Sequence, residues 1–126
     1  MNRPIDIVIP LNPRSKKNSQ QIFKNKQGRP FITQSKIYKQ FEQDCGAFLA
    51  GFYNLGINAP INLKCVFYRV DRRKCDITNL LNATQDILVK YGVIEDDNFK
   101  IVESIDGSRI KYDKENPRTE ITITFH

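Results

Sequence analysis

The sequence contains one histidine, His126, and it occupies the last of the 126 positions. Ser-His-Asp and Cys-His catalytic groups need an imidazole as proton acceptor, so the chemistries that depend on them have no usable base here. We expect His126 to dangle at the chain end rather than to ligate a metal ion.

Cysteine is also scarce. The three cysteines, Cys45, Cys65 and Cys75, are odd in number and have no CxxC spacing. A disulfide framework and a zinc ribbon are therefore not expected, and a reducing cytoplasm is the compartment that fits. The sequence lacks a P-loop and a GxGxxG motif, so we expect no nucleotide cofactor.

Long apolar runs are absent too. None approaches the ~18 residues of a membrane span, so we expect no membrane association. The opening stretch MNRPIDIVIPLNPRS has the character of a strand rather than of a signal peptide. With 40% apolar and 27% charged residues, the composition predicts one globular domain over residues 1–126.

Positive charge is concentrated in the first third of the chain. Residues 1–40 hold nine Lys or Arg and one acid, Asp6, for a net charge of +8, whereas the remainder carries a net charge of −2. A basic segment of this kind suits a polyanion such as nucleic acid, and it equally suits a solvated basic surface.

Hydrophobic periodicity predicts an α/β fold of the α+β type, with a mixed β-sheet, two main helices and a basic N-terminal hairpin. The expected elements are a strand at 5–9, a hairpin at 21–33, a helix at 35–52, a strand at 61–70, a helix at 78–91, and strands at 100–105 and 119–125. Ser35 is the expected N-cap of the first helix, Gly28 the hairpin turn and Gly92 the stop of the second helix.

Apolar stripes on both predicted helices are assigned to the core. In the first helix the stripe comprises Ile37, Tyr38, Phe41, Cys45, Phe48, Leu49 and Phe52. In the second helix it comprises Leu80, Ala83, Thr84, Ile87, Leu88 and Tyr91, with Leu81 beside it.

Three neighbouring acids, Glu95, Asp96 and Asp97, follow the second predicted helix, and Asp76 stands at its start. Fourteen helical residues advance about 21 Å, and residues 92–97 in extended form return about 17 Å. A reversal at Gly92 would therefore let Asp97 approach Asp76. Two carboxylates ~4 Å apart repel by about 4 kcal/mol at an effective dielectric near 20, so the pair would need a proton or a cation. Oxygen ligands favour Mg²⁺ or Mn²⁺.

The second predicted helix also has a polar face, on which Asn79, Asn82 and Asp86 recur at helical spacing. By spacing alone, Asp86 is expected to be solvated. Amides are poor helix formers, so we expect Asn79 and Asn82 to bond to another group.

The segment DITNLLNATQDILVKYGVIEDDN resembles the signature of RusA-like Holliday junction resolvases. That signature runs Asp-x-Asp-Asn-x-x-Lys-x-x-x-Asp-x-Leu, then Gly-x-x-x-Asp-Asp. It is matched in order and without gaps by Asp76, Asn79, Asp86, Leu88, Gly92, Asp96 and Asp97. The N-terminal half is also similar, with a strand ending in IPLNPRSKKN, a basic hairpin, and Ser35-x-x-Tyr38 opening a helix. The resemblance covers nearly the whole chain.

The resemblance implies a homodimeric endonuclease, dependent on Mg²⁺ or alternatively on Mn²⁺, that resolves four-way DNA junctions by paired cuts in a bacterial or phage-infected cell. The metal-binding and catalytic acids carry over to Asp76 and Asp97, with the adjacent Asp96 as a further expected ligand. Thr78 stands where the commoner pattern has a second acid, and Asn82 where it has a lysine, so both join the expected catalytic set. The DGSR turn at residues 106–109 looks like a branch from Gram-positive bacteria and their phages.

The expected DNA contacts come mostly from the basic N-terminal region and from residues around the acids. They are Arg14, Lys16, Lys17, Asn18, Lys24, Lys26, Arg29, Lys74, Asn79 and Arg109. Two other readings stay open: a DNA-binding or regulatory module that keeps the fold without cleavage, as Thr78 and Asn82 suggest, and an unrelated α/β protein whose acidic turn is only a solvated loop.

Overall fold

The computed structural model describes residues 3–16, 20–24, 30–34 and 36–126. Its elements, in chain order, are β1 (Ile5–Ile9), β2 (Gln20–Lys24), β3 (Pro30–Gln34), α1 (Lys36–Phe48), β4 (Ile61–Arg69), α2 (Ile77–Lys90), β5 (Val102–Ser104), β6 (Arg109–Tyr112) and β7 (Arg118–Phe125). The predicted α+β class is confirmed, and so is every predicted element, although several boundaries shift by a few residues. Strand β6 is an addition that the sequence pattern did not predict. Neither helix has the length and apolar character of a membrane span within the described ranges.

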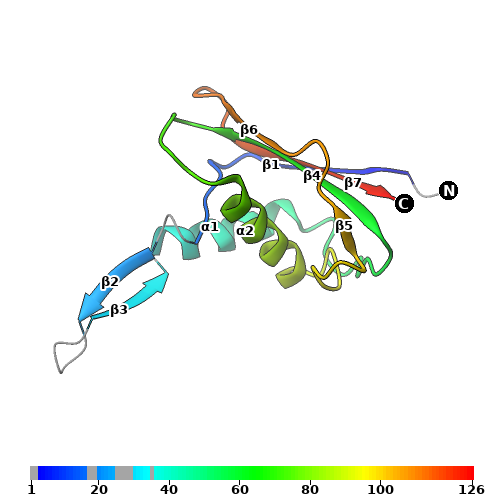
Figure 1. Ribbon diagram of the computed structural model, residues 1–126, viewed down its shortest axis with the longest axis horizontal. Helices are drawn as coiled ribbons and strands as arrows, with labels where there is room; N and C mark the ends of the chain where they lie inside the picture. Colours follow the sequence, from blue (N-terminus) through cyan, green and yellow to red (C-terminus); the bar gives the residue numbers. More distant parts are fainter. Residues whose placement is uncertain (1–2, 17–19, 25–29, 35) are drawn as a thin grey trace.

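Strand β4 is the centre of a mixed five-stranded sheet. The order is β1-β7-β4-β5, and β6 also pairs with β4. Strand β7 runs antiparallel to both β1 and β4, whereas β5 and β6 run parallel to β4. Helices α1 and α2 lie together on one face of this sheet (Figure 1).

The helix-covered face holds the core because residues of β4 alternate between the two faces. Ile61, Leu63, Cys65 and Phe67 are buried as predicted. Each fully buried apolar side chain of this size stabilises the fold by about 1.5–3 kcal/mol. They join one cluster with residues of the other strands and helices, including Ile7, Ile9, Cys45, Leu49, Leu80, Ile87, Leu88, Ile121 and Ile123.

The three cysteines are free. Burial raises the pKa of the Cys65 thiol to about 12, and burial together with nearby acids raises that of Cys45 to about 12 as well. Both thiols therefore stay protonated and behave as small apolar core groups, as expected for Cys45 from its place in the helical stripe.

Strands β5 and β6 form an interrupted outer edge beside β4. β5 pairs with the first residues of β4, and β6 pairs with the last four, so that Arg69 lies opposite Tyr112. All four residues of β6 are exposed. This explains why the hydrophobic pattern gave no sign of the strand: it is held by its backbone pairing rather than by buried side chains.

Side chains bridge the interruption between β5 and β6. The Asn62 amide exchanges two hydrogen bonds with the backbone of Asp106, at 2.8 and 3.1 Å. Ser108 Oγ accepts a hydrogen bond from the Cys65 N–H at 3.0 Å. Backbone groups that the missing ladder would leave unpaired are thus satisfied, and the pairing with β4 resumes at Arg109 with a shifted register.

Helix α1 differs from its prediction in two respects. It ends at Phe48 rather than near Phe52, because the chain there tightens into turns in which Leu49 N–H donates to Gly46 and Phe52 N–H donates to Leu49. In addition, Ile37 is 57% exposed and Phe48 is 39% exposed, so these two residues are not core. The expected N-cap Ser35 and turn residue Gly28 lie outside the described residues.

His126 does not dangle. Its backbone N–H donates to the carbonyl of Pro60 at 3.1 Å, and its Nε2 lies 3.0 Å from Ser104 Oγ. The end of β7 is therefore held against the start of β4 and against β5.

The β2–β3 hairpin extends away from the sheet and the helices (Figure 1). Its strands pair antiparallel, with Ile22 opposite Ile32. This confirms the predicted hairpin.

Gly92 turns the chain after α2 with φ of +73°, and an added Cβ would lie 3.0 Å from the backbone nitrogen of Asn54. We predict that Gly92→Ala destabilises the protein by about 1–2 kcal/mol, because an L-residue is strained in the left-handed region. Gly51→Ala is the control, since a Cβ there meets nothing within 4 Å. Urea unfolding of both variants measures the difference, and equal stabilities would contradict the assigned backbone strain.

Candidate functional site

Asp76 is the residue from which α2 begins. Its backbone is extended, with φ of −98° and ψ of 130°, and its carbonyl accepts hydrogen bonds from the N–H groups of Asn79 and Leu80. Its side chain makes no capping bond to the helix backbone. The exposed carboxylate instead accepts a hydrogen bond from Asn79 Nδ2 at 3.2 Å. Asn79 therefore bonds to another group, as predicted, and it orients Asp76.

Thr78 and Asn82 lie on the same helix. Both are exposed, Thr78 in the first turn of α2 and Asn82 one turn further on. A hydroxyl and an amide at these positions can orient water or phosphate oxygens, but neither contributes charge.

Asp96 and Asp97 stand side by side but have different environments. Asp96 Oδ1 accepts a hydrogen bond from the Asp97 N–H at 2.7 Å, and its Oδ2 accepts one from Asn98 Nδ2 at 3.0 Å. These bonds, the backbone bond first, lower the pKa of Asp96. Asp96 thus uses both oxygens to shape the acidic turn.

The pKa of Asp97 is raised. Partial loss of hydration is the largest cause, followed by the hydrogen bond with the Asp96 side chain; the negative charges of Asp86 and Asp96 add to the effect. Negative charge is therefore less well compensated on Asp97 than on Asp96. A cation beside it would remove that penalty.

Asp86, on α2, is one of the acids whose charge raises the pKa of Asp97. It also forms an ion pair with a lysine. Lys16 Nζ lies 3.0 Å from Asp86 Oδ2, and both side chains are more than one-third exposed. An exposed pair of this kind contributes only about 0–1 kcal/mol, so it is easily exchanged. Lys16 and Asp86 are 70 residues apart in sequence, and their contact brings the N-terminal segment onto the helix.

The predicted acids do not form a ready three-carboxylate cluster. Across the described parts of the chain, no three or more His, Cys, Asp or Glu side chains gather as a metal-binding group. Asp76 bonds to Asn79, and Asp76 is not among the groups that shift the pKa of Asp97. That Asp76 and Asp97 share one metal ion remains a prediction.

Two basic pockets flank the loop that leads from β4 to Asp76. The first has a volume of about 350 Å³, and its lining includes four cations, Arg14, Arg69, Arg73 and Lys74, with Asp71 as the acid. Arg14 and Lys74 were predicted as DNA contacts from separate parts of the sequence, and the fold brings them to the same pocket.

The second pocket lies on the β6 side of the same loop and has a volume of about 340 Å³. It shares Arg69, Arg73 and Lys74 with the first pocket and adds Arg72 and Lys111 as further cations. Cys75, the neighbour of Asp76 in the chain, also lines it. Asp76, the candidate metal ligand, is thus the next residue in the chain after a strongly basic pocket.

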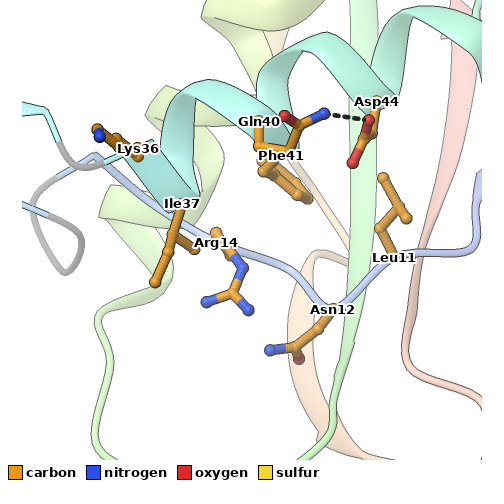
Figure 2. Close-up of a pocket in the computed structure, with 8 residues that line it drawn as sticks. All are labelled: Leu11, Asn12, Arg14, Lys36, Ile37, Gln40, Phe41 and Asp44. Atoms are coloured by element: carbon orange, nitrogen blue, oxygen red, sulfur yellow. Dashed lines mark hydrogen bonds between the residues drawn. The ribbon is translucent and has the colours of Figure 1, made fainter.

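Arg14 also borders a third pocket, of about 490 Å³, between the segment after β1 and the first turns of α1. Figure 2 shows its guanidinium directed into the open space beside Asn12, with Ile37 and Phe41 along the helix side. Asp44 and Gln40 are joined by a hydrogen bond of 2.8 Å at the other end (Figure 2). This pocket is more apolar than the two basic ones, and Lys36 is the cation that it adds to Arg14.

Of the remaining predicted DNA contacts, four lie outside the described residues and two lie on strands. Lys17, Asn18, Lys26 and Arg29 lie outside the described residues. Lys24 is the last residue of β2. Arg109 is exposed at the start of β6, opposite Val66.

Arg69, Arg72, Arg73 and Lys111 were missed by the sequence prediction. The run RRK, immediately before Cys75 and Asp76, could have identified Arg72 and Arg73, because it places three cations beside an acid. Arg69 and Lys111 could not be found in this way, since their place in the pocket depends on the pairing of β4 with β6.

The arrangement combines hard oxygen ligands with a cationic surface. Carboxylates hold Mg²⁺ or Mn²⁺, and arginine and lysine hold phosphate oxygens. This is the set of groups that a metal-dependent phosphodiester hydrolysis requires.

Comparison with known protein families agrees with this chemistry. A family model described as Endodeoxyribonuclease RusA matches residues 10–124 of the 126-residue chain. The match includes both helices, β4, the acidic turn and both basic pockets. A search of curated proteins gave no match.

We predict that Asp86→Asn lowers the pKa of Asp97, because it removes a negative charge that raises it. Carbon-detected NMR titration of the Asp97 carboxyl measures this directly. Asp44→Asn on α1 is the control, since Asp44 is not among the groups that shift Asp97. An unchanged Asp97 titration in Asp86→Asn would show that the two carboxylates do not interact.

Proposed function

Because the chain belongs to the RusA family of endodeoxyribonucleases, we propose that it resolves four-way DNA junctions by metal-dependent hydrolysis of phosphodiester bonds. The family match over nearly the whole chain is the observation that carries this proposal. The basic pockets beside Asp76 support it, because a junction presents phosphates of several strands at once.

The residues proposed to hold the metal are Asp76 and Asp97. Both offer carboxylate oxygens, and Mg²⁺ commonly binds through one or two carboxylates while keeping waters and a substrate phosphate. The donor set therefore fits Mg²⁺ or Mn²⁺ without a third protein acid. Such an ion, when bound, supplies a Lewis acid and a water of lowered pKa for attack on phosphorus.

The chain's own groups would then position the substrate. Asn79 holds the Asp76 carboxylate, and Asp96 orders the turn that carries Asp97. Thr78 and Asn82, exposed on the same helix, would orient water or phosphate oxygens. Arg109 at the start of β6 would add positive charge near the cleaved strand.

The proposed DNA contacts fall into two groups. Arg14 and Lys74 line the first basic pocket, and Lys16 reaches the polar face of α2. Lys17, Asn18, Lys24, Lys26 and Arg29 belong to the basic N-terminal segment and hairpin. A homodimer would present these surfaces twice, which suits the two-fold symmetry of a junction and of paired cuts.

We predict that Asp97→Asn reduces junction cleavage by at least about 100-fold, because loss of the carboxylate removes a metal ligand and thus the metal's contribution to the barrier. Junction binding should be retained or tightened, since a negative charge is removed near phosphate. A labelled mobile four-way junction incubated with Mg²⁺ or Mn²⁺, together with a gel-shift assay in EDTA, measures both quantities.

Glu103→Gln provides the matched control, because Glu103 is an exposed acid on β5 that belongs neither to the acidic turn nor to the proposed metal ligands. It should cleave at the wild-type rate. Full activity of Asp97→Asn would remove the proposed metal site. Wild-type binding without cleavage in either metal would instead identify a DNA-binding protein that keeps this fold, as Thr78 and Asn82 suggest.

Junction affinity should also fall steeply between about 50 and 200 mM salt, because ionic phosphate contacts release counterions. We predict that Arg14→Ala and Lys74→Ala each make the slope of log affinity against log salt less negative by about 1. Lys114→Ala is the control, since this exposed lysine lines neither basic pocket. Fluorescence anisotropy measures the slopes, and identical slopes would exclude Arg14 and Lys74 as phosphate contacts.

A further inference from the structure

Tyr112, the last residue of β6, combines exposure with a basic environment. Tyr112 and Arg72 both line the second basic pocket, and the Arg72 guanidinium carbon lies over the Tyr112 ring, 4.4 Å from its centre. Tyr112 is 45% exposed. An aromatic ring so placed contributes little to the core; Arg72 covers one of its faces, and part of the remaining surface is accessible.

The position of Tyr112 is fixed by the backbone on both sides. Tyr112 lies opposite Arg69 in the β4–β6 ladder, and the next residue, Asp113, donates its N–H to the carbonyl of Arg69 at 2.9 Å. The Asp113 carboxylate in turn accepts a hydrogen bond from Arg118 Nη1 at 3.0 Å. The ring is therefore presented from a rigid support, which reduces the entropy lost when a ligand binds.

Arg72 is presented by an ordered loop. Arg73 N–H donates to Asp71 Oδ1 at 3.0 Å, and Arg69 Nη1 donates to the Arg73 carbonyl at 2.6 Å. These two bonds constrain the backbone around Arg72 and hold the loop to the end of β4. The Arg72–Tyr112 contact is thus an arranged pair of flat groups, one cationic and one aromatic.

We propose that Arg72 and Tyr112 form a stacking platform for a DNA base that is unpaired at the branch point, with Arg73 beside it to hold the phosphate of the same nucleotide. Aromatic rings and guanidinium planes both stack on nucleobases without regard to sequence. Bases within a continuous duplex have their faces covered by neighbouring bases, so a platform of this kind selects a nucleotide that is unstacked. This inference rests on the proposed function only in taking branched DNA as the ligand.

The platform also has a defined place relative to the candidate carboxylate. Cys75 lines the same pocket as Tyr112 and directly precedes Asp76. Consecutive Cα atoms are about 3.8 Å apart. A nucleotide held in this pocket therefore neighbours the phosphate that would lie at Asp76, so the platform would position the strand to be cut.

The test uses a four-way junction carrying 2-aminopurine at successive positions around the crossover, bound by the full chain in EDTA so that no cleavage occurs. We expect the wild-type protein to change the fluorescence of 2-aminopurine at one nucleotide beside the branch. Tyr112→Ala should abolish that change and weaken junction binding about tenfold, whereas linear duplex binding should change less than about twofold. Tyr112→Phe, which keeps the ring, should behave as wild type.

Arg72 gives a second, independent variant. Arg72→Ala should lose part of the fluorescence change, and Arg72→Lys, which keeps the charge without the planar group, should not restore it. Circular dichroism and thermal unfolding of each variant establish that the fold is intact, which the exposed positions of both side chains favour.

The outcomes separate this inference from the nuclease proposal. An unchanged fluorescence signal and junction affinity in Tyr112→Ala, or an equal loss for junction and duplex, would overturn the platform even if the wild type cleaves. Tyr112-dependent junction binding by a protein that cleaves in neither Mg²⁺ nor Mn²⁺ would support the platform and overturn the nuclease. Absence of wild-type binding to any junction would overturn both.

Discussion

The guanidinium of Arg69 fixes the path by which the chain leaves the central strand. It donates to the carbonyl of Arg73 at 2.6 Å and lies 3.7 Å from Asp71, and its side chain is only 14% exposed. Hydrogen bonds from a charged donor contribute about 1.5–3 kcal/mol, more than a typical exposed ion pair. Because the loop then enters α2 at Asp76, the same contacts determine where the candidate carboxylate stands and how the loop divides the two basic pockets.

That arrangement resolves an electrostatic conflict. A carboxylate that approaches a phosphodiester repels it, and the acidic turn adds further negative charge. The four cations of the first pocket belong to the loop and strand next to Asp76 or to the segment after β1. At physiological ionic strength charges act over about 8 Å, so cations this close offset the repulsion locally while distant ones do not. The distribution of charge around the loop is therefore more informative than the chain's net charge of +6.

The sequence predicted correctly those strands and helices that bury one face, and those contacts that join residues close together in the chain. The alternation in β1 and β4 and the stripe of α2 follow directly from which residues are apolar, and Asp76 and Asn79 meet because they are one helical turn apart. Strand β6 could not be predicted in this way, since its four exposed residues are held by pairing with β4. The contact of Lys16 with Asp86 likewise spans 70 residues and depends on the completed fold. Ile37 and Phe48 carry the apolar pattern of a core and are nevertheless exposed.

Strand β6 has a consequence for how copies of the protein can associate. Among the described strands it pairs with β4 alone, so its other side offers backbone groups that could recruit a strand from another molecule. The strand is four residues long and carries Arg109 and Lys111. Like charges on a short edge disfavour edge-to-edge sheet growth, which protects the protein against aggregation. A second copy would then have to join through another surface, and each Tyr112 would stay open to the solvent and to its ligand.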